Sequence, residues 1–206
     1  MIDTAFLITS FVTLFVIVDP IGLTPVFIAL TQGMPSERRR SIALRATITA
    51  AVLLAVFAAL GEAVLGFIGI SMPAFRVAGG ALLFLTALDM LFERRNKRRE
   101  DRSEEDDFDD PSVFPLAIPL MAGPGSIATV ILLTGQQPGF TGFAMVMGVV
   151  IAVLAILLVM CLFSGLFERM LGKTGITVVT RLLGMLLAAL SVQFVLDGLR
   201  AFGFAA

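Results

Sequence analysis

Asp19 is a carboxylate in the middle of a long apolar run, residues 5–31. A helix of about 20 residues crosses a bilayer, and a carboxylate at the centre of such a helix costs about 2.5–3.5 kcal/mol. A side chain of this kind normally faces a partner, a cavity or a proton path. We therefore hypothesise that Asp19 binds the ammonium group of a solute or a coupling proton. The alternative is a protonated Asp19 that only caps a helix.

Proline and glycine interrupt two apolar runs. Residues 19–25 read Asp-Pro-Ile-Gly-Leu-Thr-Pro, and residues 119–126 read Pro-Leu-Met-Ala-Gly-Pro-Gly-Ser. Proline lacks a backbone donor and glycine permits non-helical angles, so neither run is expected to form a continuous helix. The helices are predicted to restart after Pro25 and after Gly125.

A helix break at membrane depth leaves backbone N–H and C=O groups without helical hydrogen bonds. Such groups are tolerated only inside the protein or against a water-filled cavity. The N–H groups at a helix start suit a carboxylate, and exposed carbonyls suit an ammonium group or a cation. The N–H groups and carbonyls of the two breaks could therefore bind the carboxylate and the ammonium group of a zwitterion. The alternative is that the breaks are kinks that only fit the helices together.

The composition indicates the kind of protein that holds these residues. Of 206 residues, 58% are hydrophobic and 15% are charged, the mean hydropathy is +0.99, and soluble domains have about 45–50% apolar residues. The chain has no His and one Cys, which excludes His-based catalysis, His-ligated metals and an intrachain disulfide. We expect an integral membrane protein in the lipid bilayer that is not an enzyme and has no metal or cofactor. The net charge of −1 gives no indication of a nucleic-acid partner.

Six apolar runs are long enough to span a bilayer. They cover residues 5–31, 42–67, 74–92, 113–134, 140–167 and 176–199. All of the 15 Lys and Arg residues except Arg76 and Arg200 lie in or beside the loops after spans one, three and five. The positive-inside rule places these odd-numbered loops in the cytoplasm and both termini outside.

The two halves of the chain are similar when they are offset by 103–106 residues. Gly22 then falls on Gly125, and Thr86 falls on Ser191. Because each half has three spans, the second half would enter the membrane from the opposite face, as in many secondary transporters. The alternative is an old duplication kept only for packing.

This pattern predicts an all-α membrane protein with six transmembrane helices, arranged as an inverted 3+3 repeat with broken first and fourth spans. Residues 1–92 would form the first three-helix repeat, and residues 113–206 the second, inverted one. Residues 93–112 are rich in both acidic and basic groups and are predicted to be a cytoplasmic linker. A regulatory or lipid-binding segment is the alternative.

Substrate-binding residues are predicted at the two breaks and at the matched positions of the third and sixth spans. The alternative for the Ser and Thr residues among them is that each hydroxyl bonds only its own helix. The predicted set is Asp19, Pro20, Gly22, Thr24, Pro25, Gly123, Pro124, Gly125, Ser126, Thr129, Thr86 and Ser191.

The motifs at the two breaks resemble those of the MarC family of bacterial inner-membrane proteins, also called the neutral amino acid transporter family. The resemblance is carried by Asp-Pro-Ile-Gly at residues 19–22 with Pro-Val-Phe at residues 25–27, and by Pro-Leu-Ala-Ile-Pro-Leu-Met-Ala-Gly-Pro-Gly-Ser-Ile at residues 115–127. It covers essentially the whole chain. It implies a multi-pass protein of the bacterial inner membrane, and transport of small neutral amino acids such as alanine, glycine and serine.

Residues and resemblance together favour a secondary transporter or exporter of small neutral amino acids or similar zwitterionic solutes. Transport would proceed by alternating access, coupled to a proton or sodium. A phosphate-binding Gly-x-x-x-x-Gly-Lys-Ser/Thr motif is absent from the sequence, which disfavours transport driven by ATP. The alternatives are a non-transporting scaffold or regulator that holds a partner through the charged linker, and an intramembrane enzyme that uses Asp19 and Asp89. The exact solute, the direction of transport, the coupling ion and the oligomeric state, a homo-oligomer included, stay open.

Overall fold

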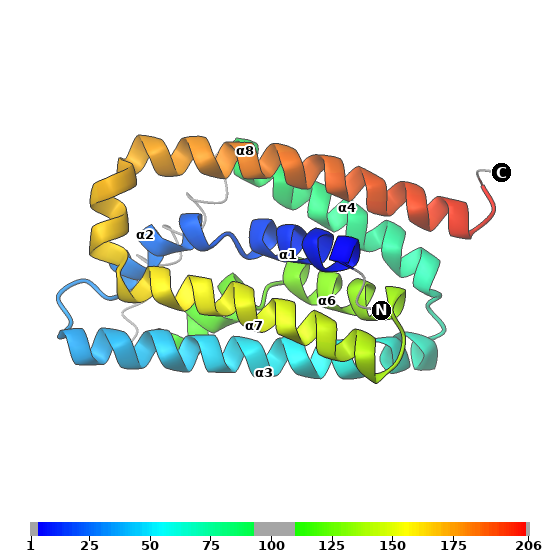
Figure 1. Cartoon of the computed structure of the whole chain (residues 1–206), viewed down its shortest axis with the longest axis horizontal. Coiled ribbons are helices and arrows are strands. Elements are labelled where there is room, and N and C mark those ends of the chain that lie inside the picture. Colours follow the sequence, from blue (N-terminus) through cyan, green and yellow to red (C-terminus); the bar gives the residue numbers. More distant parts are fainter. Residues whose placement is uncertain (1–3, 93–109, 205–206) are drawn as a thin grey trace.

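The computed structural model describes residues 4–92 and 110–204, and within these ranges the chain is helical and contains no strand. Most of the predicted charged linker, residues 93–109, lies outside the described residues. Figure 1 shows the helices side by side in an elongated bundle. They are α1 (Thr4–Val18), α2 (Pro20–Leu30), α3 (Ser36–Ile68), α4 (Met72–Leu91), η1 (Ser112–Met121), α6 (Pro124–Gln136), α7 (Phe140–Leu162) and α8 (Ser164–Ala201).

Length and hydropathy give the described part of the chain five helical segments that can cross a membrane, with α1 and α2 taken together as one. A sixth is added when η1 and α6, which are bent by 55°, count as a single span. Large apolar side chains cover the outer faces, as shown by Ile48 of α3 and Ile151 of α7, which are 60% and 59% exposed. Such faces are stable in lipid and not in water. The predicted all-α membrane class is confirmed.

Three helix boundaries differ from those predicted by hydropathy: the start of α3, the end of α7 and the start of α8, which was predicted at residue 176. α3 begins at Ser36, six residues before the predicted span, because a helix can continue beyond the apolar zone with charged residues in its first turns. α7 ends at Leu162, before the predicted end at residue 167, and α8 begins at Ser164. Ser164 and Gly165 are weak helix formers, which accounts for the interruption there.

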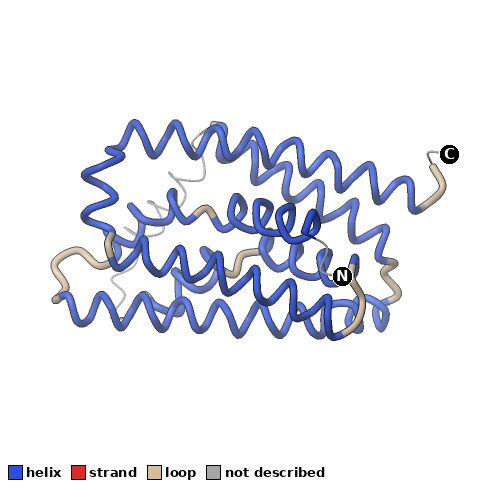
Figure 2. Tube along the Cα trace, viewed as in Figure 1, coloured by secondary structure: helices blue, strands red, loops and turns tan. Residues whose placement is uncertain are grey.

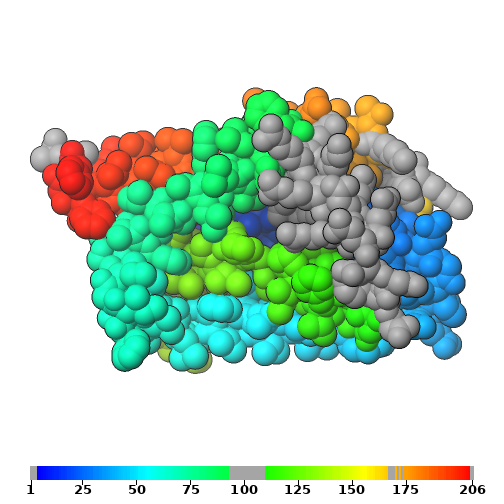
Figure 3. All heavy atoms as spheres, turned by 180° about the vertical axis from the view of Figure 1, so that it is seen from behind, coloured from blue at the N-terminus to red at the C-terminus, as the bar shows by residue number. Residues whose placement is uncertain are grey.

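The helices of the first half pack against those of the second half. α3 packs against η1 and α6, whereas α7 packs against α1 and α2. Within α8, the backbone at Gly172 departs from helical angles, and Thr174–Ala201 is the part that can span a membrane. Figure 1 shows that α1 and α2 run opposite to η1 and α6, that α3 runs opposite to α7, and that α4 runs opposite to this part of α8. Figure 3, seen from behind, shows α6 on the surface between α3 and α4.

The bundle has two ends with different chemistry. The basic end holds the turn from α2 to α3, the junction of α7 and α8, and the three arginines Arg38 to Arg40 in the first turns of α3. The terminal end holds both chain termini, the turn from α3 to α4 and the turn from α6 to α7. These two names are used below.

α4 and α8 form the most extensive helix pair, and glycines let their backbones approach closely. A Cβ at Gly80 would lie 2.8 Å from the carbonyl oxygen of Ser191. A Cβ at Gly198 would lie 3.0 Å from the carbonyl oxygen of Pro73. Side chains at these positions would force the two helices apart.

Candidate solute-binding site

The first break is a single residue, Asp19, between α1 and α2. Its backbone is left-handed, with φ 53° and ψ 66°, and it is the one residue other than glycine with positive φ in the described part of the chain. Aspartate tolerates this conformation better than most residues. Its Oδ1 accepts a 3.0 Å hydrogen bond from the backbone N–H of Gly22, and Pro20 stands at the first position of α2, where its missing N–H costs nothing. Asp19 therefore caps α2, and it does so with no exposed surface.

The predicted restart after Pro25 is wrong, because α2 begins at Pro20 and Pro25 lies inside it. The Asp19 cap and the proline after it fix the helix start five residues earlier. Gly22 also belongs to this turn, since a Cβ there would overlap the Asp19 carboxylate. The capping role foreseen as an alternative for Asp19 is thus present in the structure, whatever else the carboxylate binds.

The second break is longer and contains no charged residue. Phe114 and Ile118 have extended backbones, with φ −126° and −121°, because each precedes a proline, which disfavours helical angles. η1 ends at Met121, and α6 begins at Pro124, two residues before the predicted restart after Gly125. Figure 2 shows both breaks as short loops in the middle of the bundle.

The Ser126 hydroxyl lies within hydrogen-bond distance of two carbonyls at the second break, and the Gly123 carbonyl also accepts the N–H of Ile127. The hydroxyl lies 2.9 Å from the carbonyl oxygen of Met121 and 3.0 Å from that of Gly123. The side chain is buried, at 2% exposure. Gly123 is required beside it, since a Cβ there would overlap the carbonyl oxygen of Pro119. Pro124, by contrast, is exposed.

Three of the predicted regions converge in the structure. A Cβ at Gly125 would lie 3.3 Å from Ile17, two residues before Asp19, and 3.9 Å from the hydroxyl oxygen of Thr86. The second break therefore packs against the end of α1 and the middle of α4. Ser191 lies beside Gly80, which is about 9 Å along α4 from Thr86 at 1.5 Å per residue.

The predicted hydroxyls other than that of Ser126 donate to carbonyls of their own helices. The distances are 2.8 Å from Thr24 to Pro20, 2.8 Å from Thr129 to Gly125, 3.0 Å from Thr86 to Leu82, and 2.6 Å from Ser191 to Ala188. A hydroxyl that has donated its proton still has an acceptor lone pair. These groups can therefore accept from an ammonium group, but they do not donate to a carboxylate without giving up a helix bond.

A cavity of about 570 Å³ opens at the basic end. We call it the basic cavity. Its lining comes from α2, the start of α3 and the junction of α7 and α8, and consists of Phe27, Ser36, Glu37, Arg39, Arg40 and residues 161–165.

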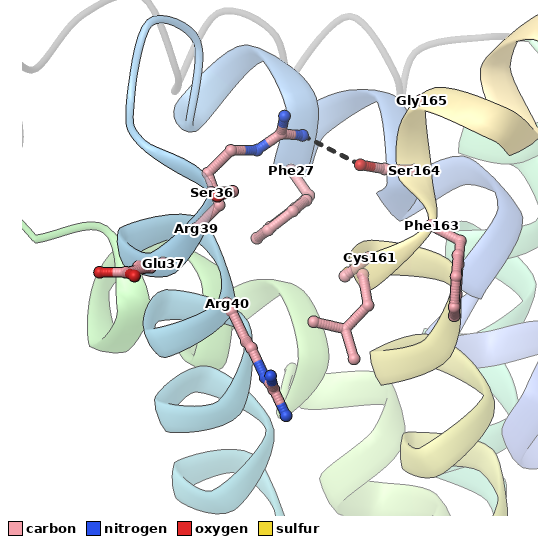
Figure 4. Close-up of a pocket in the computed structure, with 10 residues that line it drawn as sticks. Phe27, Ser36, Glu37, Arg39, Arg40, Cys161, Phe163, Ser164 and Gly165 are labelled. Carbon is pink, nitrogen blue, oxygen red and sulfur yellow. Dashed lines mark hydrogen bonds between the residues drawn. The ribbon is translucent and has the colours of Figure 1, made fainter.

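Arg39 crosses the basic cavity. Its Nη2 donates to the Ser164 hydroxyl at 3.0 Å, and its guanidinium carbon lies 5.7 Å from the centre of the Phe27 ring, within cation–π range. Figure 4 shows Arg39 reaching past Phe27 toward Ser164, while Glu37 points away from them. Sequence reasoning used Arg39 only to orient the chain, because its partner is 125 residues away and no local signal connects the two.

A second cavity, of about 400 Å³, lies at the terminal end. We call it the terminal cavity. It is lined by Ala58, Ala59, Glu62, Thr134, Pro138, Gly139, Phe140 and Phe143. The lining of neither cavity includes Asp19 or residues 123–126.

An exposed ion pair ties the segment before η1 to α3. Arg45 Nη1 lies 2.6 Å from Asp110 Oδ2, and the two side chains are 55% and 43% exposed. Hydrogen bonding with Ser112, followed by the charges of Arg45 and Arg38, holds the pKa of Asp110 below its ordinary value of 3.8. Among the described residues, no group of three or more His, Cys, Asp or Glu side chains is arranged to hold a metal ion.

The apolar outer faces, the spanning helices and the two interruptions define an integral multi-pass membrane protein. The chain belongs to the MarC family, since residues 4–202 match the family described as MarC family integral membrane protein. It is 38% identical over 197 residues to a UPF0056 membrane protein of Archaeoglobus fulgidus, covering 95% of this chain and 92% of that protein. It is 35% identical over 200 residues to the UPF0056 membrane protein YvbG of Bacillus subtilis, covering 95% of each. Relatives thus occur in both bacteria and archaea, and no solved structure matches the chain.

Proposed function

We propose that this protein is a secondary transporter that moves small neutral amino acids, or similar zwitterionic solutes, across the bilayer by alternating access. The observation that carries the proposal is the pair of helix interruptions deep in the bundle, one in each half of the chain. Interrupted helices at matching positions of two repeats form the solute sites of many secondary transporters. The chain acts as a carrier and not as an enzyme.

The proposed architecture is an inverted repeat. α1, α2, α3 and α4 correspond to η1, α6, α7 and α8, with the helix pairs on either side of each break forming one broken span. Two observations support this assignment. α3 packs on the broken pair of the second half, whereas α7 packs on the broken pair of the first half. Corresponding elements also run in opposite directions (Figure 1). The basic end faces the cytoplasm of the inner membrane, as the distribution of Lys and Arg favours.

Asp19 is the proposed coupling group. Its carboxylate accepts the N–H of Gly22 at the start of α2, and an ionised carboxylate is a stronger acceptor than a protonated one. Binding of a proton or a cation at Asp19 would weaken this cap and free α2 to move. The acceptor lone pairs of Thr24 and Thr129 suit the ammonium group of the solute, and the N–H groups at the start of α6 suit its carboxylate.

Counterflow tests the proposal without an assumption about the driving ion. Proteoliposomes loaded with unlabelled alanine or glycine are given the labelled solute outside, and the wild type is compared with Asp19→Asn and Asp89→Asn. We expect accumulation by the wild type and by Asp89→Asn, because Asp89 lies near the end of α4. Asp19→Asn should lower the initial rate roughly tenfold or more, the factor that a lost charged hydrogen bond can supply.

Two results would contradict the proposal in different ways. A flat trace for correctly folded wild type across a panel of small amino acids would remove this substrate class. Normal transport with an unchanged pH and sodium dependence in Asp19→Asn would remove Asp19 as the coupling group and leave transport standing.

A further inference from the structure

The basic and terminal cavities are related by the same offset that aligns the two breaks. Gly22 and Gly125 are 103 positions apart, and six of the eight residues around the terminal cavity lie 103 positions from a residue around the basic cavity. The pairs are Ser36 with Gly139, Glu37 with Phe140, Arg40 with Phe143, Ala58 with Cys161, Ala59 with Leu162, and Glu62 with Gly165.

The two cavities are also built from corresponding elements at opposite ends of the bundle. The basic cavity is enclosed by α2, the start of α3 and the end of α7. The terminal cavity is enclosed by the end of α6, the start of α7 and the later part of α3. In each case, the helix that follows a break reaches the cavity. Phe27 is eight residues beyond Asp19, about 12 Å along α2, so a movement of α2 at the Asp19 turn displaces the aromatic ring on which Arg39 rests.

The helices are held together by different contacts at the basic end and at the terminal end of the bundle. At the basic end, Arg39 bonds Ser164, and the offset of 103 places Gly142 and Gly61 at the matching positions of the other end. Both glycines are buried, and a Cβ at Gly61 would overlap the side chain of Ile131. The basic end is therefore held by a hydrogen bond that can exchange partners, and the terminal end by close apolar packing.

We propose that the two cavities are the two vestibules of one solute path, that the Arg39–Ser164 hydrogen bond is the gate at the basic end, and that Arg39 receives the carboxylate of the solute there. This inference rests on the proposed transport function. A carboxylate accepts more strongly from a guanidinium than a neutral hydroxyl does, so a solute carboxylate displaces Ser164 and opens the gate. Arg39 is held in place for this exchange by the Phe27 ring. In alternating access, opening one vestibule closes the other.

The single cysteine of the chain, Cys161, lines the basic cavity and is 2% exposed. It reports opening directly through its rate of labelling by a membrane-impermeant maleimide in proteoliposomes of known orientation. Its counterpart, Ala58, supplies the second reporter as Ala58→Cys in a Cys161→Ala background. We expect Cys161 to react only from the basic side and the cysteine at position 58 only from the other side.

The gate is tested with Ser164→Ala and Arg39→Gln, each combined with either reporter. Loss of the Arg39–Ser164 bond should raise labelling at position 161 roughly tenfold and lower it at position 58 by a similar factor. Arg40→Gln is the matched control, because it removes a charge from the same cavity and keeps the Ser164 bond. Arg39→Lys serves as a second control, because it keeps the positive charge. An unchanged elution volume on size-exclusion chromatography shows that each variant is folded.

The carboxylate assignment is tested by the effect of solute on labelling. Alanine should raise the labelling rate at position 161 in the wild type, because its carboxylate opens the gate, whereas alaninamide, which lacks the carboxylate, should not. Arg39→Gln should abolish the difference between the two solutes. Equal effects of the two solutes would overturn the role of Arg39. Labelling that rises at both positions, or changes at neither, would overturn the gate even if counterflow is normal. Flat counterflow with reciprocal labelling would instead contradict the transport function and leave the gate in place.

Discussion

The interruption at Asp19 and the interruption before Pro124 lie one in each half of the chain, yet different groups build them. At Asp19, one residue turns the backbone and its own carboxylate caps the next helix. Before Pro124, two residues that precede prolines extend the chain, and an uncharged hydroxyl bonds the freed carbonyls. The first break is built on an ionisable side chain, the kind of group to which a proton or a cation binds. The second is set by sterics and a neutral hydrogen bond, so it has no charged group through which to respond.

Replacing Asp19 by Ala should have the largest effect. The variant loses the cap of α2, worth about 0.5–2 kcal/mol, and places a residue with a Cβ and no polar group in the left-handed region, at about 1–2 kcal/mol. Thermal unfolding in detergent should show the loss, and Asp19→Asn should stay within about 0.5 kcal/mol of the wild type, because asparagine both caps helices and tolerates positive φ. If Asp19→Ala unfolds like the wild type, the first break does not depend on this side chain.

Replacing Gly22 or Gly125 by alanine should destabilise the protein to different extents at the two breaks. Gly22→Ala places a Cβ on the fixed Asp19 carboxylate and should cost about 1–3 kcal/mol by overpacking. Gly125→Ala meets Ile17 at 3.3 Å and gains helix propensity, so the net change should stay below about 1 kcal/mol. Denaturation midpoints of the two variants check this order, and equal midpoints would contradict the difference between the breaks.

Ser126→Ala should have a moderate effect that does not depend on pH. The substitution removes the hydroxyl that donates to the Met121 carbonyl, whereas the Gly123 carbonyl keeps the N–H of Ile127. One buried carbonyl left without this donor costs about 1–3 kcal/mol. Counterflow measured from pH 5 to pH 8 should then keep the shape of the wild-type profile, in contrast to Asp19→Asn. A changed profile in Ser126→Ala would show that the second break also takes part in coupling.

The smallest effect is expected at the Arg45–Asp110 pair, outside both breaks. Both partners are well exposed, so the pair should contribute about 0–1 kcal/mol. Because the pKa of Asp110 is lowered in the folded state, this contribution is present above its ordinary value of 3.8 and is lost as the pH falls through the lowered value. Asp110→Asn should therefore destabilise slightly at pH 7 and not at pH 2, as measured by unfolding at low salt. A penalty that persists at pH 2 would assign the effect to something other than the ion pair.

The class of the fold and the places of the breaks were predictable because they depend on local features. Long apolar runs predict spanning helices, and proline with glycine predicts interruptions within them. The start of α2 was missed because two prolines, Pro20 and Pro25, could each begin a helix, and the choice depends on the cap that Asp19 makes. The hydrogen bonds of the Ser and Thr side chains to their own helices were anticipated as an alternative, and they are present.

The two cavities were not predictable from local patterns. Arg39 and Ser164 are far apart in sequence and meet only when α3 and the junction of α7 and α8 come together. The repeat offset could have directed attention to these segments, because it relates the start of α3 to the start of α7. It does not indicate which of the aligned residues enclose a space, which depends on how the helices cross.

The pairing of α4 with α8 also determines when helix packing can be completed during synthesis. The ribosome makes α4 well before α8, so α4 enters the membrane before its principal partner exists. Until α8 is made, the close backbone contact between Gly80 and Ser191 cannot form. Among the helices that the structure describes, α8 is made last, and it completes the bundle.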